Sequence, residues 1–235
     1  MPYDVNSLQA RYIRAETERI RLKYLTSALR KQVETAIKPN SMELSPLSGG
    51  FLPSDERPPN DSNEAGILWK NYTSGNAGLN KRYRIYIGYL YERMGWEVDY
   101  SCGKNLISRK NDKLIVTLTE TATTVNLENM YSLLGLAMEY RKDNISGTVS
   151  ALCITSSTLI SRVKSLAQKF NIAVREHFYL RNFPCVRCKA DIDGQGVYYV
   201  PDDEEYLSVR IEPDKGDKYC WSIDEAKSMN FTRPY

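Results

Sequence analysis

Hydrophobic residues recur at alternating intervals of three and four along residues 4–37, a run without glycine or proline. Eight of the ten positions on this seam are apolar or aromatic. A repeat of 3.5 residues predicts a coiled coil, and at 1.5 Å per residue its helix would be roughly 50 Å long. The alternative is a long helix that packs on its own domain. We expect the coiled coil, formed with a second copy or with another helix through positions that include Leu8, Tyr12, Leu22, Leu29 and Val33.

The rest of the chain divides into three parts. Residues 39–78 are rich in proline at their start and predict a linker or a meandering surface segment. Residues 79–182 predict the order helix, three strands, helix, strand, helix, strand, with a polar turn at Asn111 and Asp112 between the second and third strands. This order predicts an α/β fold, a mixed sheet with helices on both faces. Residues 183–235 predict a small α+β module with one helix opened by Ser222 and Glu225.

Composition indicates the cellular compartment and limits the size of the hydrophobic core. The chain has 235 residues, 42% of them hydrophobic, which is enough for one sizeable core with extensions. It contains no apolar run long enough for a membrane span and no signal-peptide core at its start. Five cysteines in a chain of this length are too few for a disulfide scaffold. We therefore expect a cytoplasmic protein with no membrane partner.

Charge is distributed unevenly. The net charge of +3 divides into +4 for residues 1–38, −3 for 39–78, +6 for 79–182 and −4 for 183–235. A basic middle part can attract a phosphate backbone. An ordinary solvated surface explains the same excess, so both interpretations stay open.

Several segments resemble Mrr-type restriction endonucleases, in the order in which that family has them. They are "RYRIYIGYLYERMGWEV", "NLISRKNDKLIVTLT", "YSLLGLAMEY", "ALCITSSTLISRVKSLAQKFNI" and "FPCVRC". The tail, with "GVYYVPDDEEY" and "YCWSIDEAKSMNF", resembles a small domain appended to one bacterial branch of the family. The resemblance covers roughly residues 80–235 and implies a restriction-endonuclease-like core. It also implies a setting in phage or plasmid conflict.

The chain departs from that family at the positions of its chemistry. Active members have an aspartate at the start of the hairpin and a Gln/Glu-x-Lys on its second strand, which hold Mg²⁺ and activate water. The matching positions here are Asn105, Thr117 and Thr119, and a helix position that often carries Glu is Arg84. The only Asp/Glu-x-Lys in the chain is residues 225–227, on the predicted tail helix. We therefore expect a protein that is not an enzyme.

The expected function is that of a catalytically inactive binding or assembly subunit. DNA is the expected ligand, held by a rim of cations around the former active site. One alternative is a divergent metal-dependent DNA endonuclease that uses Glu97, Asp99 or Glu120. The other is a structural protein-interaction module that binds no nucleic acid. The cations of the predicted rim are Arg82, Arg84, Lys104, Arg109, Lys110 and Lys113.

Two further groups of residues were candidates for chemistry. His177 is the one histidine, and we expect it to serve packing or the surface rather than catalysis. Cys185, Cys188 and Cys220 could supply thiolates for zinc, but a fourth ligand is not evident, so we expect reduced thiols and no cofactor. The tyrosines of residues 81–91 alternate with basic residues, which fits base stacking, although their helical spacing favours a place in the core.

Overall fold

A computed structural model of the chain describes residues 68–69, 75–121, 124–143, 147–191 and 196–234. The chain divides into two compact units, residues 1–42 and 43–235, and every described residue belongs to the second. The predicted coiled-coil helix and most of the linker lie outside the described residues, as do the five seam residues named above. Within the described ranges, every helix is too short or too polar to cross a lipid bilayer.

The larger part of the described chain, up to residue 182, is an α/β core with a mixed five-stranded sheet, as the hydrophobic pattern predicted. Its order of elements follows the predicted order throughout. The strands lie in sequence order, antiparallel from β1 to β3 and parallel from β3 to β5. The elements are α3 (Gly75–Arg93), β1 (Glu97–Asp99), β2 (Asn105–Lys110), β3 (Lys113–Glu120), α4 (Leu127–Asp143), β4 (Thr148–Thr155), α5 (Ser161–Lys169) and β5 (Ala173–Arg175).

The turn between β2 and β3 has the chemistry that a tight hairpin requires. Lys110 is opposite Lys113, which leaves Asn111 and Asp112 as the two-residue loop. Asn111 has a φ of 54°, in the left-handed region that asparagine tolerates better than most residues. This turn fixes the register of the whole hairpin, and with it the face on which each side chain lies.

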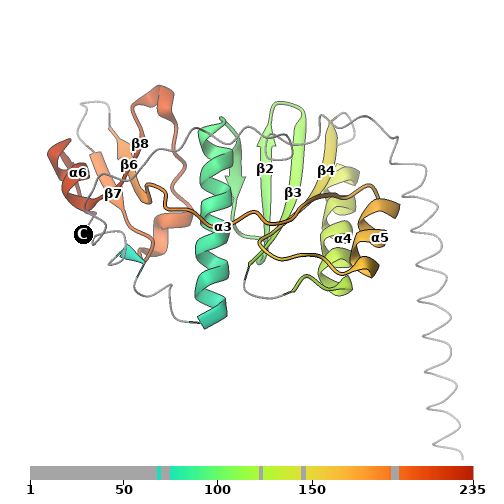
Figure 1. Cartoon of the computed structure of the whole chain (residues 1–235). Helices are drawn as coiled ribbons and strands as arrows, with labels where there is room; N and C mark the ends of the chain where they lie inside the picture. The colour runs from blue at the N-terminus through green and yellow to red at the C-terminus, as the bar shows by residue number, and fades with distance from the viewer. Residues whose placement is uncertain (1–67, 70–74, 122–123, 144–146, 192–195, 235) are drawn as a thin grey trace, which may run out of the picture. The chain divides into compact units, whose positions relative to one another are not determined.

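Helices cover the two faces of the sheet, with α3 on one face and α4 and α5 on the other (Figure 1). Leu106, Ile115, Leu152 and Ile154 share a buried cluster with α3. Neighbouring residues on the same strands point to the opposite face, where α4 and α5 contribute Met130, Leu133, Val163 and Ala167 to the core. Both parallel crossovers therefore place their helices on one side of the sheet.

The tail forms a second sheet, with the order β8-β6-β7-β9. It contains β6 (Val186–Ala190), β7 (Gly196–Tyr199), β8 (Lys218–Cys220), α6 (Ile223–Ser228) and β9 (Phe231–Thr232), with two short 3-10 turns at Glu204–Leu207 and Pro213–Lys215. Ser222 caps α6 by accepting a hydrogen bond from the Glu225 amide at 2.9 Å, as its sequence predicted. The Glu225 carboxylate accepts from the Trp221 amide.

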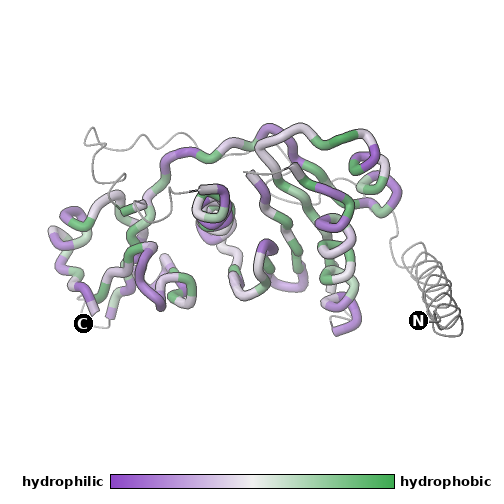
Figure 2. The backbone as a smooth tube through the Cα atoms, turned by 90° about the horizontal axis from the view of Figure 1, so that it is seen from below, coloured by the Kyte–Doolittle hydropathy of each residue, from purple (hydrophilic) through white to green (hydrophobic). Residues whose placement is uncertain are grey.

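Helix α3 lies between the two sheets, and it is buried on nearly all sides from Tyr83 to Glu92 (Figures 1 and 2). Helical spacing of apolar residues by itself indicates a single buried face. The difference arises because the tail covers the face that would otherwise meet solvent, through contacts such as those of Phe183 with Tyr86 and Tyr89. The tyrosines of this helix therefore belong to the core, as their helical spacing favoured. Gly88 permits the close approach of Tyr100, whose hydroxyl occupies the space where a Cβ would lie.

Candidate functional site

Thr117 and Thr119 lie on the α3 face of the sheet and are buried. The hydroxyl of Thr117 hydrogen-bonds with the Tyr91 hydroxyl of α3 at 3.1 Å. The hydroxyl of Thr119 donates to the carbonyl of Lys104 at 3.1 Å. Both hydroxyls are thus used inside the structure, and neither is directed at an open site.

Asn105 lies on the opposite face of the sheet. It is paired with Leu118, and paired residues on antiparallel strands share a face, whereas Thr117 and Thr119 alternate to the other one. Arg84 is half-buried on α3, and burial lowers the pKa of its guanidinium. The four positions that match the family's chemistry therefore do not meet in one place. Of the β3 residues that share the face of Asn105, Leu118 is its pair and Glu120, at the end of the strand, is the charged one.

Glu120, at the carboxyl end of β3, is the centre of a polar cluster that the sequence did not single out as a unit. Its buried carboxylate forms an ion pair with Lys104 at 3.0 Å and accepts a hydrogen bond from the Asn80 amide. Asn80 also accepts from the Thr121 amide at 2.9 Å. Asn105, diagonally adjacent on the same face, is 8% exposed, and its side-chain oxygen has no hydrogen-bond partner among the described residues. We call Asn80, Lys104, Asn105 and Glu120 the carboxyl-end cluster.

A second polar group lies at the ends of β4 and β5. Glu176 forms an ion pair with Lys164 at 2.8 Å and accepts from the Leu159 amide. The hydrogen bond from Lys164 lowers the pKa of the Glu176 carboxyl. The imidazole of His177 is within 3.3 Å of the Thr158 hydroxyl and 3.4 Å of the Tyr179 hydroxyl. These groups flank the carboxyl ends of parallel strands, the usual position for ligands in α/β sheets.

The carboxylates near the hairpin do not form a metal centre. Among the described residues, no group of three or more His, Cys, Asp or Glu side chains could hold a metal ion. Glu97 forms an ion pair with Arg210 at 3.3 Å, and Asp99 accepts from the Ser101 amide at 2.8 Å. Glu120 is therefore a single carboxylate whose charge Lys104 already offsets, and a Mg²⁺ ion would have to displace that ammonium group to bind there.

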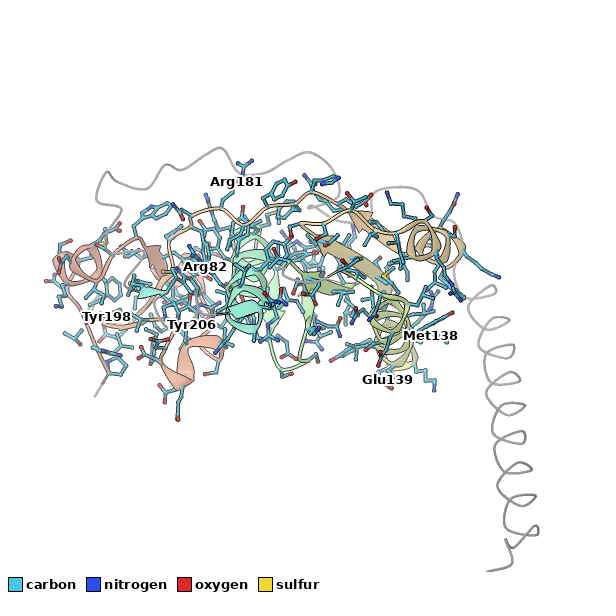
Figure 3. The ribbon with its side chains drawn as sticks, turned by 60° about the horizontal axis from the view of Figure 1, so that its bottom comes forward. Arg82, Met138, Glu139, Arg181, Tyr198 and Tyr206 are labelled. Atoms are coloured by element: carbon cyan, nitrogen blue, oxygen red, sulfur yellow. The ribbon has the colours of Figure 1, made fainter. Side chains whose placement is uncertain are left out.

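The six cations of the predicted rim lie at separate places. Lys104 belongs to the carboxyl-end cluster. Arg82 lies on α3 (Figure 3), with its guanidinium 5.1 Å from the ring centroid of Trp69. Arg109, Lys110 and Lys113 lie together at the opposite end of the sheet, next to the β2–β3 turn. Because α4 runs antiparallel to β3, its last turn lies at this same end (Figure 1) and adds two exposed cations, Arg141 and Lys142.

The cations at this end are partly engaged within the structure. Lys110 donates to the carbonyl of Met94 at 2.6 Å. Arg109 lies over the ring of Tyr140, with 5.4 Å between its guanidinium carbon and the ring centroid. Lys110 and Lys113 are exposed and directly opposite each other on adjacent strands. We call Arg109, Lys110, Lys113 and Arg141 the hairpin-end cations.

The tail cysteines are split between two places. The sulfur atoms of Cys188 and Cys220 are 3.5 Å apart, on the neighbouring strands β6 and β8. Cys185 lies instead beside Trp69 and Arg82, and burial raises the pKa of its thiol to about 12. The three thiols therefore do not converge on one point in this structure.

A buried ion pair joins α3 to the tail. Arg187 of β6 donates to both carboxylate oxygens of Glu92 at 3.0 Å. It also donates to the carbonyls of Tyr206 and Val209. Tyr219 donates a hydrogen bond to Glu92. Burial by itself would lower the pKa of Arg187, but the Glu92 carboxylate and the surrounding tyrosines hold it well above its ordinary value.

Sequence reasoning did not find this pair. The one available signal was an arginine in the otherwise apolar and cysteine-rich stretch "FPCVRC", because a strand of this kind is expected to be buried. Its partner lies 95 residues away in the chain. Comparisons with family models, with curated proteins and with solved structures find no match for this chain.

Proposed function

We propose that this protein is a non-catalytic member of the restriction-endonuclease-like class, and that it binds the phosphate backbone of nucleic acid through the hairpin-end cations. The order of elements and the mixed sheet support the class. The lone, neutralised Glu120 supports the absence of cleavage. Assembly through residues 4–37 remains part of the proposal, and so does a setting in phage or plasmid conflict.

The observation that carries the proposal is the position of Lys110 opposite Lys113. Like charges directly opposite each other on antiparallel strands are destabilising. Here Arg109 and the last turn of α4 add further positive charge at the same end of the sheet. A phosphate backbone would offset this repulsion, because it presents regularly spaced negative charges.

The test is a titration of a 20-base-pair duplex at several salt concentrations, read by fluorescence anisotropy. With three or four phosphate contacts, we expect the affinity to fall with a log–log salt slope of about −3 to −4. Lys110→Ala combined with Lys113→Ala should weaken binding and flatten the slope by up to about 2. The matched control is Lys169→Ala combined with Lys227→Ala, which removes the same charge from two exposed lysines elsewhere.

Two outcomes would overturn the proposal. If the duplex does not bind at low salt, or if both double variants have the same effect, the protein is better described as a structural interaction module. If the same mixtures with Mg²⁺ or Mn²⁺ cleave the duplex, and Glu120→Gln abolishes cleavage, the protein is a divergent endonuclease. The second outcome would mean that Asn105, Glu120 and Lys104, which the fold does bring together, form an active site.

A further inference from the structure

The outer face of α4 has a row of solvent-facing positions spaced alternately three and four apart. They are Glu128, Tyr131, Gly135, Met138 and Lys142. Four are exposed and Met138 is half-buried, whereas Met130, Leu133 and Ala137 on the other side of the helix are buried against the sheet. Tyr131 is 46% exposed, which makes it one of the few large hydrophobic side chains on the surface. Figure 3 shows Met138 and Glu139 on α4, away from the sheet.

Gly135, at the middle of this row, has no structural reason to be glycine within the described part of the chain. A Cβ added there would have no atom within 4 Å. Glycine inside a helix is less favourable than alanine, because it loses more backbone entropy on folding. A small residue at this position does, however, let the backbone of a second helix approach closely.

The charges along α4 indicate which partner helix would be complementary to this surface. The first turn contains Glu128, and the last turn contains Arg141 and Lys142. If a second α4 lies antiparallel with Gly135 at the crossing point, Glu128 is opposite the partner's Lys142. In the same arrangement Tyr131 is at the level of the partner's Glu139, within reach of its carboxylate. A parallel arrangement would instead place like charges together.

We propose that two copies of the chain pair through the outer faces of their α4 helices, antiparallel, with Gly135 on the two-fold axis. An interface between identical copies must be self-complementary about such an axis, and this row of residues has that property. The surface is separate from the seam of residues 4–37. A single pair of helices roughly 25 Å long buries much less surface than the roughly 1,200–2,000 Å² of a stable interface. The pairing is therefore weak and depends on protein concentration.

The test is sedimentation velocity of the full chain over a range of concentrations. It is run in a background with Leu22→Asp and Leu29→Asp, so that any association through residues 4–37 does not contribute. Glu128→Lys and Lys142→Glu should each weaken pairing by about tenfold, since each reversal replaces two attractive contacts with two repulsive ones. The double variant, with the two charges exchanged, should restore it.

Gly135→Ala gives a second, independent readout. It should raise the midpoint of chemical denaturation at low protein concentration, because alanine favours the helix, and yet weaken pairing, because its methyl group keeps the helices apart. The proposal is overturned if the background protein stays monomeric at every concentration, or if the charge exchange fails to restore pairing. It is equally overturned if Gly135→Ala leaves pairing unchanged.

Discussion

Arg187 joins the tail to α3 through its buried ion pair with Glu92. It is 1% exposed and satisfies Glu92, which is itself buried. Removing one partner of such a pair leaves an uncompensated charge in the interior, whereas an exposed ion pair contributes little. Each charge of the pair thus compensates the burial of the other, so the loss of either partner destabilises the fold.

We expect Arg187→Ala to lower the free energy of unfolding by about 3–5 kcal/mol. Arg210→Ala is the control, because it removes an ion pair whose two side chains are 57% and 50% exposed, and it should cost less than about 1 kcal/mol. Urea denaturation of both variants measures the difference. Equal costs would show that the buried pair does not hold the tail in place.

Helix α3 is the element that differs most from an ordinary surface helix. Its Gly88 and the Gly135 of α4 are both inside helices, yet their surroundings are opposite: Tyr100 fills the space beside Gly88, and the space beside Gly135 is open. The first glycine is explained by packing within the chain. The second is not, and that contrast supports an external contact for α4.

Gly88→Ala should therefore destabilise the protein by about 1–3 kcal/mol, the usual cost of overpacking a core. At a concentration where the chain is monomeric, Gly135→Ala should stabilise it by about 0.5–1 kcal/mol. Thermal or urea denaturation of the two variants side by side tests the signs. A neutral Gly88→Ala would mean that Tyr100 can move away without loss.

The hydrophobic pattern along the chain predicted the elements of the α/β core but not their surroundings. Strand and helix periods are local, so they revealed β2, β3 and α4 and the polar turn at Asn111. The burial of α3 on two sides depends on a contact with β6, far along the chain, which no local period reports. The same limit applies to the site. Lys104, just before β2, meets Glu120 at the end of β3. A search for the Asp/Glu-x-Lys motif cannot find this pair, because its two residues are 16 positions apart in the chain.

At the scale of the whole molecule, the core and the tail share one hydrophobic cluster, which runs from Trp69 and α3 to Val186 and Phe231. The sequence divided the chain at residue 183 into a core and a separate small module. In the structure, two tail residues pack on α3 of the core: Phe183 contacts Tyr86 and Tyr89, and Tyr219 contacts Tyr89. The predicted division at residue 183 therefore cuts through one continuous hydrophobic core.

A chain that ends at residue 182 should consequently fail to unfold cooperatively, because Glu92 loses Arg187 and the tail side of α3 becomes exposed to water. Circular dichroism during heating, together with binding of a hydrophobic dye, measures this. A chain that ends at Arg233 serves as the control and should behave like the full protein. A sharp transition in the shorter chain would show that the tail is dispensable for folding.

The position of Glu92 between the two sheets also constrains how the protein is made. Ribosomes add about 5–20 residues per second, so the 95 residues that separate Glu92 from Arg187 take roughly 5–20 s to follow. During that interval α3 can settle on the strands of the core but its second face has no cover. The nascent chain therefore exposes Tyr86 and Tyr89 of α3, which the tail later covers, until its last quarter has emerged.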